Sequence, residues 1–335
     1  MSEENGFGRR KMLTLRVQNS IQKCLDSIPD DYEGEVFITV PAGIYEERVE
    51  ITRPNVTLEG ISAAGSIIRS AYHASEILKD NKRRGTFRSY TMCVDAENVH
   101  LKNLTIENAS GPRKTAEQAL ALYADGEKLT VTNCRIVGRQ DTLFIAPLPK
   151  KELYPGGFAG PGETKERITL HQYYRECEIE GDVDFIFGSG AALFEKCTIR
   201  SVSEKEITED FLSGKINGLG YVCAPSTYCG EEFGFVFNHC DFVSDLPKES
   251  VYLARPWRDY GKCVFLNCRM EEHIKAEGFH DWNKENARRN CFFAEYESTG
   301  PGATGKRADF AACLNLEQAE SFSAERFKKL YGFDS

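Results

Sequence analysis

The stretch Tyr174-Arg-Glu-Cys177-Glu-Ile179 is one copy of a six-residue pattern that recurs along the chain. Each copy reads apolar, any residue, polar, cysteine, polar, apolar. Because cysteine alternates with an apolar residue two places on, each copy has the period of a β-strand. The other copies are residues 131–136, 194–199, 237–242 and 265–270, and residues 101–106 fit the pattern with leucine in place of cysteine.

Repetition of one strand pattern at a fixed register predicts stacked coils, in which every coil adds a small apolar side chain to the same interior column. Successive cysteines are separated by 43, 20, 43 and 28 residues, and we expect the intervals of 43 to cover two coils. Strands this short, without helical linkers between them, favour an all-β chain with the parallel β-helix fold. The alternative is a chance recurrence of cysteine, which is a common buried residue.

Helical patterns are confined to the two ends of the chain. Residues 17–25 predict a short helix that caps the first coil, and residues 314–330 predict a helical or irregular tail on the outside. No linker separates domains, so we expect a single domain over residues 1–335, with a core from about 14 to 310 and a tail from 311 to 335. Further strands are predicted at residues 36–40, 49–51, 56–58 and 168–170.

The composition of the 335-residue chain is that of a soluble globular protein, with 41% hydrophobic and 28% charged residues. A formal net charge of −9 argues against nucleic acid as a partner, and no apolar run is long enough to span a membrane. No secretory signal is visible, so we expect a cytoplasmic monomer whose twelve cysteines are reduced. The cysteine spacings do not fit a zinc site, and we expect no metal and no cofactor.

Two aspartates occupy equivalent places in the repeat, since Asp141 and Asp184 each follow a repeat cysteine by seven residues. In stacked coils such residues can face each other across neighbouring or next-neighbouring strands. Both lie among apolar and aromatic residues, where a carboxylate loses hydration and its protonation depends on its neighbours. Two such groups can divide the roles of acid and nucleophile. The alternative is that Asp141 is a turn residue and Asp184 a structural ion-pair partner.

Around these aspartates the chain resembles the pectin methylesterase (pectinesterase) family, which are carbohydrate esterases with a right-handed parallel β-helix fold. The resemblance runs from about residue 14 to residue 310 and rests on several motifs that occur in the family's order. These are Gly43-Ile-Tyr45-Glu-Glu47, Gln118-Ala-Leu-Ala-Leu122, Gln140-Asp-Thr-Leu143, Asp184-Phe-Ile-Phe-Gly188 and Leu253-Ala-Arg255-Pro-Trp257, followed by residues 294–303.

The resemblance implies a carboxylic ester hydrolase that removes methyl groups from methyl-esterified galacturonate units of pectin or its oligosaccharides and releases methanol. It implies Asp184 as the nucleophile. Asp141 would protonate the leaving methoxide and then activate water as a base. Arg255 would hold Asp184 ionised by lowering its pKa, while Asp141 would keep a raised pKa. Gln118 and Gln140 would donate hydrogen bonds to the oxyanion, and Trp257, Phe187, Thr86 and Phe144 would line the sugar groove.

The chain departs from the family pattern in two places that bear on the site. Asp182 stands where the family usually has threonine, two residues before Asp184. Residues 145–169, rich in proline and glycine, form a longer connection than is usual. It leaves directly after Asp141, so we expect it to overhang the groove, close one end and favour short oligosaccharides over polymer.

Two rival functions use the same fold. One is a catalytically inactive β-helix that only binds carbohydrate, although every implied catalytic position holds a competent residue. The other is a β-helix pectate lyase or polygalacturonase. Lyases of that kind need a calcium-binding carboxylate cluster and glycosidases need paired acids around the glycosidic bond. The sequence shows no separate acidic cluster that suits either reaction.

Overall fold

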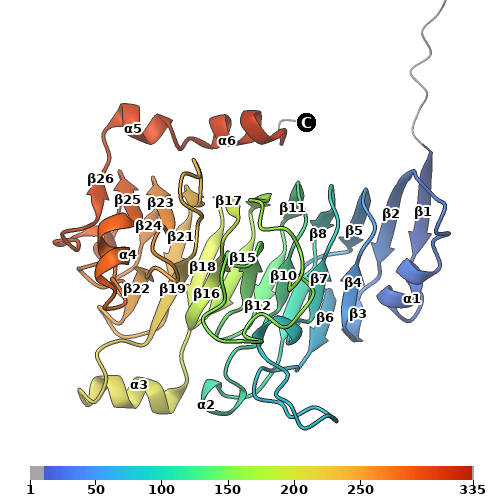
Figure 1. Ribbon diagram of the computed structural model, residues 1–335, viewed down its shortest axis with the longest axis horizontal. Helices are drawn as coiled ribbons and strands as arrows, with labels where there is room; N and C mark the ends of the chain where they lie inside the picture. Colours follow the sequence, from blue (N-terminus) through green and yellow to red (C-terminus); the bar gives the residue numbers. More distant parts are fainter. Residues whose placement is uncertain (1–10, 334–335) are drawn as a thin grey trace, which may run out of the picture.

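The structure, a computed structural model, describes residues 11–333. In this part of the chain three parallel sheets, here called A, B and C, wind around one core as a parallel β-helix (Figure 1). From β2 to β22 each coil passes through one strand of A, then B, then C. Figure 1 shows the coils following the sequence from one end of the molecule to the other.

The strands of the three sheets have the following bounds. Sheet A contains β1 (Met12–Arg16), β2 (Glu35–Val40), β5 (Val56–Gly60), β8 (His100–Lys102), β11 (Leu129–Thr132), β14 (His171–Arg175), β17 (Ala191–Glu195), β20 (Phe235–Asn238), β23 (Lys262–Leu266), β25 (Phe292–Tyr296) and β26 (Ala312–Cys313). Sheet B contains β3 (Gly43–Glu46), β6 (Ser66–Ser70), β9 (Thr105–Asn108), β12 (Arg135–Val137), β15 (Glu178–Gly181), β18 (Thr198–Ser201), β21 (Asp241–Val243) and β24 (Arg269–Met270). Sheet C contains β4 (Val49–Ile51), β7 (Met92–Val94), β10 (Leu122–Ala124), β13 (Leu143–Ile145), β16 (Val183–Gly188), β19 (Gly220–Pro225) and β22 (Val251–Ala254).

The repeat cysteines lie at the corner between sheets A and B, and not inside a strand as their spacing suggested. In each copy the polar residue before cysteine has a positive φ, for example 55° at Glu176 and 54° at Lys196. This left-handed residue turns the chain sharply, and the cysteine that follows points into the core. The predicted interior column is confirmed, because the Cys177 and Cys197 thiols are buried and each contacts a carbonyl of the previous coil.

Each interval between neighbouring repeat cysteines corresponds to one coil, so the expectation that 43 residues cover two coils was wrong. Strand β12 pairs directly with β15, and β18 pairs directly with β21. The additional residues leave the coil as excursions, one over residues 146–170 and one that contains helix α3 (Lys205–Leu212). The spacing of the cysteines could not distinguish a second coil from a long loop.

The core is a ladder of side chains stacked from coil to coil. Phe194, Phe237 and Phe265 on neighbouring strands of sheet A stack with ring centroids 4.6 and 5.0 Å apart. All three rings are fully buried. Burial of large aromatic side chains, each worth about 2 to 3 kcal/mol, is the main stabilising contribution available to strands this short.

The first coil is capped by α1 (Ile21–Asp26), which is shorter than the helix predicted over residues 17–25. Ser20 is its N-cap and accepts a hydrogen bond from the Lys23 backbone N–H. The Glu47 carboxylate accepts from the Ile21 N–H at 2.7 Å. These caps set the start of the helix because they satisfy free N–H groups of the first turn.

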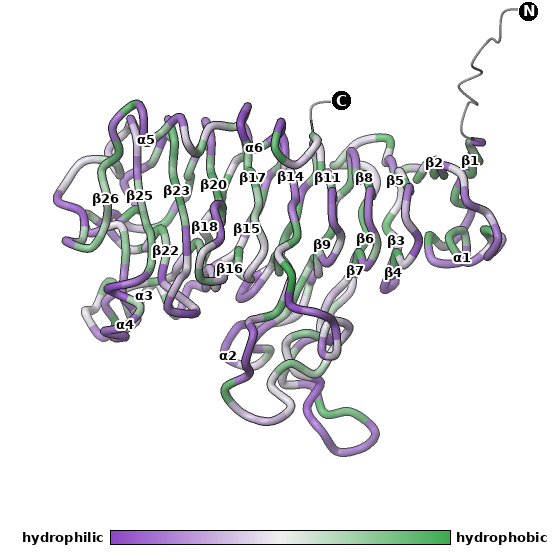
Figure 2. Tube along the Cα trace, turned by 45° about the horizontal axis from the view of Figure 1, so that its top comes forward, coloured by the Kyte–Doolittle hydropathy of each residue, from purple (hydrophilic) through white to green (hydrophobic). Residues whose placement is uncertain are grey.

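Several helices lie in the middle of the chain, which corrects the expectation that helices occur only at its two ends. They are α2 (Arg113–Ala116), α3, α4 (Glu285–Asn290) and the 3-10 turns η1 (Thr86–Arg88) and η2 (Pro301–Ala303), all in excursions from the coils. Residues 168–170 form no strand, since β14 begins at His171. In Figure 2 the excursions near α2 project away from the coils.

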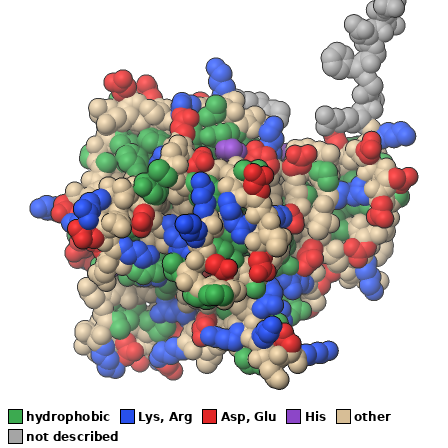
Figure 3. Space-filling view, in the orientation of Figure 1, with side chains coloured by type: hydrophobic (Ala, Val, Ile, Leu, Met, Phe, Trp, Pro, Cys, Tyr) green, Lys and Arg blue, Asp and Glu red, His purple; other side chains and the backbone are tan. Residues whose placement is uncertain are grey.

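The C-terminal tail forms α5 (Leu316–Glu320) and α6 (Ala324–Tyr331), which lie along the outside of the coils in Figure 1. Phe327 of α6 is fully buried and packs edge-on against Phe233, with ring centroids 5.2 Å apart. This agrees with the helical or irregular outer tail expected from the sequence. No helix in residues 11–333 is both long and apolar enough to cross a membrane. Figure 3 shows acidic and basic side chains intermixed on one face of the molecule.

Candidate active site

A cavity of about 390 Å³ lies over sheet C, where excursions from several coils meet. Strand ends of sheet C supply its floor, and residues 153–158 supply part of one wall. Among the described residues it gathers eight of the nine side chains predicted to form the site. They are Thr86, Gln118, Gln140, Asp141, Asp184, Phe187, Arg255 and Trp257.

Asp141 and Asp184 are brought together by the register of two neighbouring strands. Strands β13 and β16 run parallel with Leu143 opposite Ile186, so Asp141 and Asp184 each come two residues before a paired position. The Asp141 N–H donates to the Val183 carbonyl at 3.0 Å, which ties the two turns together. The predicted pairing of the two aspartates across stacked coils is therefore confirmed.

Both aspartates have a left-handed backbone, with φ of 63° at Asp141 and 50° at Asp184. For residues other than glycine this conformation is uncommon and costs on the order of 1 kcal/mol or more. The β16–β19 pairing is also irregular between Val183 and Ile186, at the position of Asp184. The carboxylates thus lie where both strands leave regular geometry, which is a frequent property of functional sites.

Arg255 holds Asp184 in a bidentate ion pair. Its Nε and Nη2 atoms donate to the two carboxylate oxygens at 2.7 and 2.6 Å. The guanidinium lies between two aromatic rings, 3.8 Å from the Tyr221 centroid and 3.7 Å from the Trp282 centroid. Because two rings and two hydrogen bonds restrain it, the guanidinium orients Asp184 rigidly.

The two carboxyl groups differ in their electrostatic surroundings. Burial raises the pKa of Asp141 well above its ordinary value, and the neighbouring Asp184 charge raises it further. Burial also raises the pKa of Asp184, which corrects the expectation of a lowered value. The hydrogen bonds and charge of Arg255 oppose that rise without cancelling it. Since no cation within residues 11–333 is bonded to Asp141 as Arg255 is to Asp184, Asp141 is the group that keeps its proton and Asp184 the one that ionises first.

Gln118 and Gln140 line the same cavity as the two aspartates. Gln140 immediately precedes Asp141, and its carbonyl accepts from the Ala119 N–H at 3.1 Å, which links the two glutamines across neighbouring coils. Among residues 11–333 neither side-chain amide has a hydrogen-bond partner. Their N–H groups are therefore available to a ligand in the cavity.

Aromatic rings form one side of the cavity. Trp257 lies 5.6 Å from Phe187 and 6.4 Å from Phe87, with the second pair stacked at 28°. Phe158, from the 146–170 excursion, meets Trp257 edge-on. Flat apolar rings of this kind suit the apolar faces of sugar rings.

Phe144 does not line the cavity, contrary to the prediction. Its side chain is fully buried, and its ring centroid is 5.0 Å from those of both Phe87 and Phe187. Tyr123 covers it from a neighbouring strand, with centroids 4.8 Å apart. Phe144 therefore supports the rings of the wall from beneath and cannot reach a ligand.

Several cavity residues were not identified from the sequence. Phe87 follows the predicted Thr86 directly, so the same short motif could have indicated it. Arg258 likewise follows the predicted Trp257 directly, whereas Trp282 and Lys284 had no comparable signal, because they come from a later excursion of the chain. Burial, followed by the charges of Arg258 and Arg255, lowers the pKa of Lys284 to about 8. The cavity thus has a cationic end in a chain of net charge −9.

The 146–170 excursion is attached to the body of the protein at both ends. The Leu148 carbonyl accepts from the Tyr228 hydroxyl at 2.6 Å. Near the other end Lys165 forms an ion pair with buried Asp125 at 2.8 Å and a second one with Asp95. Between these attachments Tyr154 and Phe158 reach the cavity wall. The structure therefore brings this excursion to the groove, as the sequence predicted.

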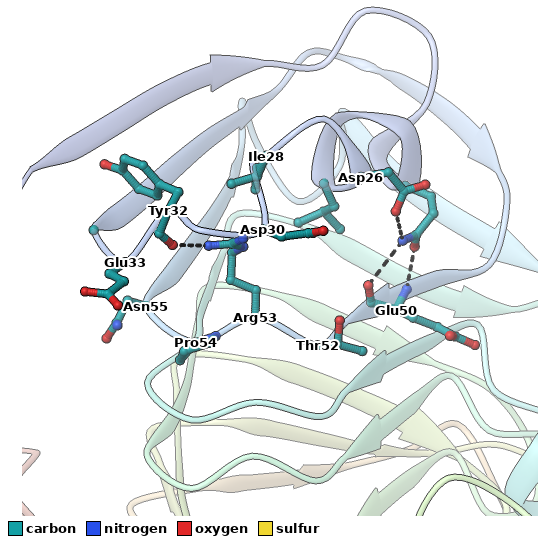
Figure 4. Close-up of a pocket in the computed structure, with 13 residues that line it drawn as sticks. Asp26, Ile28, Asp30, Tyr32, Glu33, Glu50, Thr52, Arg53, Pro54 and Asn55 are labelled. Carbon is teal, nitrogen blue, oxygen red and sulfur yellow. Dashed lines mark hydrogen bonds between the residues drawn. The ribbon is translucent and has the colours of Figure 1, made fainter.

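A second hollow, of about 520 Å³, lies at the N-terminal end of the coils (Figure 4). The Arg53 guanidinium there donates to the carbonyls of Tyr32 and Pro29. Gln22 donates to the Asp26 carboxylate and accepts from the Glu50 N–H. These groups satisfy one another and close the end of the core, so this hollow is not a candidate for chemistry.

Comparison with known proteins identifies the family. The Pectinesterase family model matches residues 16–150 and 157–330. Pectinesterase 31 of Arabidopsis thaliana is 30% identical over 92% of this chain and 87% of its own length. Probable pectinesterase/pectinesterase inhibitor 64 of the same plant is 28% identical over 92% of this chain. The matched region covers 48% of the length of that relative. The crystal structure of a pectin methylesterase in complex with hexasaccharide VII superposes with a TM-score of 0.76, at 25% identity over 95% of this chain and 97% of that one. The chain belongs to the pectinesterase family of enzymes.

Proposed function

We propose that the protein hydrolyses methyl esters of galacturonate units in pectin or its oligosaccharides and releases methanol. The observation that carries this proposal is the pair of facing aspartates, one bound to Arg255 and one without a cation bonded to it. The solved complex of a similar pectin methylesterase with a hexasaccharide supports an oligosaccharide substrate. The aromatic wall and the cationic end of the cavity suit a chain of acidic sugars.

In the first half of the reaction an Asp184 oxygen attacks the carbonyl carbon of the methyl ester. The carbonyl oxygen becomes an oxyanion, which accepts hydrogen bonds from the amides of Gln118 and Gln140. As the tetrahedral intermediate collapses, the bond to methoxide breaks and Asp141 gives its proton to the leaving oxygen. Methanol departs, and the substrate acyl group remains joined to Asp184 as an anhydride.

In the second half Asp141 is ionised and acts as a base. It takes a proton from a water molecule, whose oxygen attacks the acyl carbon. The bond to Asp184 breaks, which frees the galacturonic acid unit and restores the Asp184 carboxylate next to Arg255; the product acid then loses its proton to water. Asp141 again holds its proton, so the site returns to its starting state.

The proposal is tested by methanol release from methylated oligogalacturonides. We expect methanol to appear in proportion to the loss of ester, with no new reducing ends and no fall in the viscosity of a pectin solution. Sugar binding without methanol would support the inactive carbohydrate-binding protein. New reducing ends or unsaturated products would instead identify a glycosidase or a lyase.

We also propose that the protein prefers short substrates, because the 146–170 excursion forms a fixed wall at the cavity. We expect kcat/KM for methylated oligogalacturonides of a few units to exceed that for long pectin. A variant that replaces residues 150–161 with a short Gly-Ser linker, and keeps the attachments at Leu148 and Lys165, should gain activity on the polymer. A clear preference of the unmodified protein for long pectin would contradict this proposal.

A further inference from the structure

Asp182 is a third buried carboxylate close to the site. It lies between β15 and β16, two residues before Asp184, and is 1% exposed. In a regular strand two residues at this spacing lie on the same face, but here the chain turns between β15 of sheet B and β16 of sheet C. Its Oδ1 atom accepts from the Val183 N–H at 2.6 Å. Its Oδ2 atom is buried and has no hydrogen-bond partner in the described part of the chain, an arrangement that costs free energy unless a charge compensates it.

The charge that compensates Asp182 is Arg113, whose Nη1 atom lies 3.8 Å from Oδ2. Arg113 is the first residue of α2, in the excursion that leads to Gln118. Its backbone N–H donates to the Glu204 carboxylate at 2.5 Å. Its Nη1 atom also donates to the Leu219 carbonyl at 3.4 Å. Asp182 therefore links the segment that carries one proposed oxyanion donor to the strand that carries the proposed nucleophile.

The charges of Asp182 and Arg113 change the pKa values of both proposed catalytic aspartates. The Asp182 charge raises the pKa of Asp141, whereas the Arg113 charge lowers the pKa of Asp184. Burial raises the pKa of Asp182 itself to about 6, although Arg113 and Arg139 lower it, and Glu204 adds a further negative charge. Asp182 is consequently ionised at neutral and alkaline pH, where its charge acts on Asp141.

We propose that Asp182 and Arg113 are positioning residues for the esterase reaction, with the Asp182 carboxylate helping Asp141 to keep its proton and Arg113 helping Asp184 to ionise. This inference rests on the proposed function. It concerns residues that touch neither the ester nor the sugar.

The test is the pH dependence of kcat/KM for methanol release. Its acid limb reports the ionisation of Asp184, and its alkaline limb reports loss of the Asp141 proton. In Asp182→Asn the alkaline limb should move to lower pH by roughly 0.5 to 1 unit, because a negative charge is removed. In Arg113→Gln the acid limb should move to higher pH, because a positive charge is removed. Asp210→Asn, on exposed α3 and paired with Lys215, removes a charge elsewhere and should move neither limb.

A purely structural role would lower the rate or the melting temperature and leave both limbs in place. If neither limb moves in a folded variant, the inference is wrong; should Asp182→Asn fail to fold, the Arg113→Gln profile decides alone. Carbon-13 NMR titration of the aspartate carboxyls gives a readout that does not need turnover. If the wild type releases no methanol but the Asp141 titration still shifts in Asp182→Asn, the proposed function fails while the charge coupling is retained.

Discussion

Replacing Asp184 with asparagine is expected to lower kcat for methanol release by about 10,000-fold or more. The amide is a poor nucleophile and cannot form the anhydride, and removal of a nucleophile in other hydrolases has effects of at least this size. Binding of a methylated oligogalacturonide should change much less, because the aromatic wall of the cavity is unaltered. The measurement is methanol release under single-turnover conditions, with binding followed separately by calorimetry.

The matched control is Asp241→Asn. Asp241 also forms an arginine ion pair, with Arg269 at 2.8 Å, but on the exposed surface of sheet B. Surface pairs of this kind contribute at most about 1 kcal/mol, so the control should retain full activity and fold normally. The melting temperatures of both variants report whether the fold is intact. An Asp184→Asn protein that keeps more than a tenth of the wild-type rate would show that Asp184 is not the nucleophile.

Replacing Asp141 with asparagine is expected to affect activity and stability in opposite directions. Activity should fall by about 1,000-fold, since the leaving methoxide loses its proton donor and the water loses its base. Stability should rise at neutral and alkaline pH. The buried position of the carboxyl favours a neutral group, and asparagine is neutral at every pH.

The sign of the stability change follows from the raised pKa of Asp141 in the folded protein. A group of this kind contributes its full stability below its unfolded pKa, near 3.8, and loses it as the pH rises through the folded pKa. Asparagine does not titrate, so the variant escapes that loss.

The difference in melting temperature, variant minus wild type, should therefore increase as the pH is raised from about 4 to 9. Thermal unfolding at several pH values measures it, with Asp241→Asn as the control for loss of one charge. A difference that is constant or falls with pH would mean that Asp141 is ionised in the folded protein. It could not then be the proton donor.

The sequence was sufficient for the repeated coil and for the pairing of the two aspartates. Cysteine marks the same corner in successive coils. Asp141 follows Cys134, and Asp184 follows Cys177, by the same seven residues, so both aspartates lie at the same side of sheet C. That inference needs only a constant register, which a parallel stack of strands enforces. Arg255 and Trp257 were also identified, but by resemblance to a family and not by geometry.

The number of coils in a cysteine interval, and whether an aromatic side chain lines the cavity or lies beneath it, could be read only from the tertiary structure. An interval of 43 residues fits two short coils as well as one coil with an excursion, and only the β12–β15 pairing distinguishes them. Phe144 was predicted at the groove but lies beneath Phe87 and Phe187, which come from other coils.

Trp282, which flanks Arg255, and Arg113, which compensates Asp182, likewise arrive from excursions distant in sequence. Local sequence determines where a strand bends and which way its side chains alternate. Burial, ion pairing and the pKa of a carboxyl depend on which other segments cover it, and those contacts are made between coils.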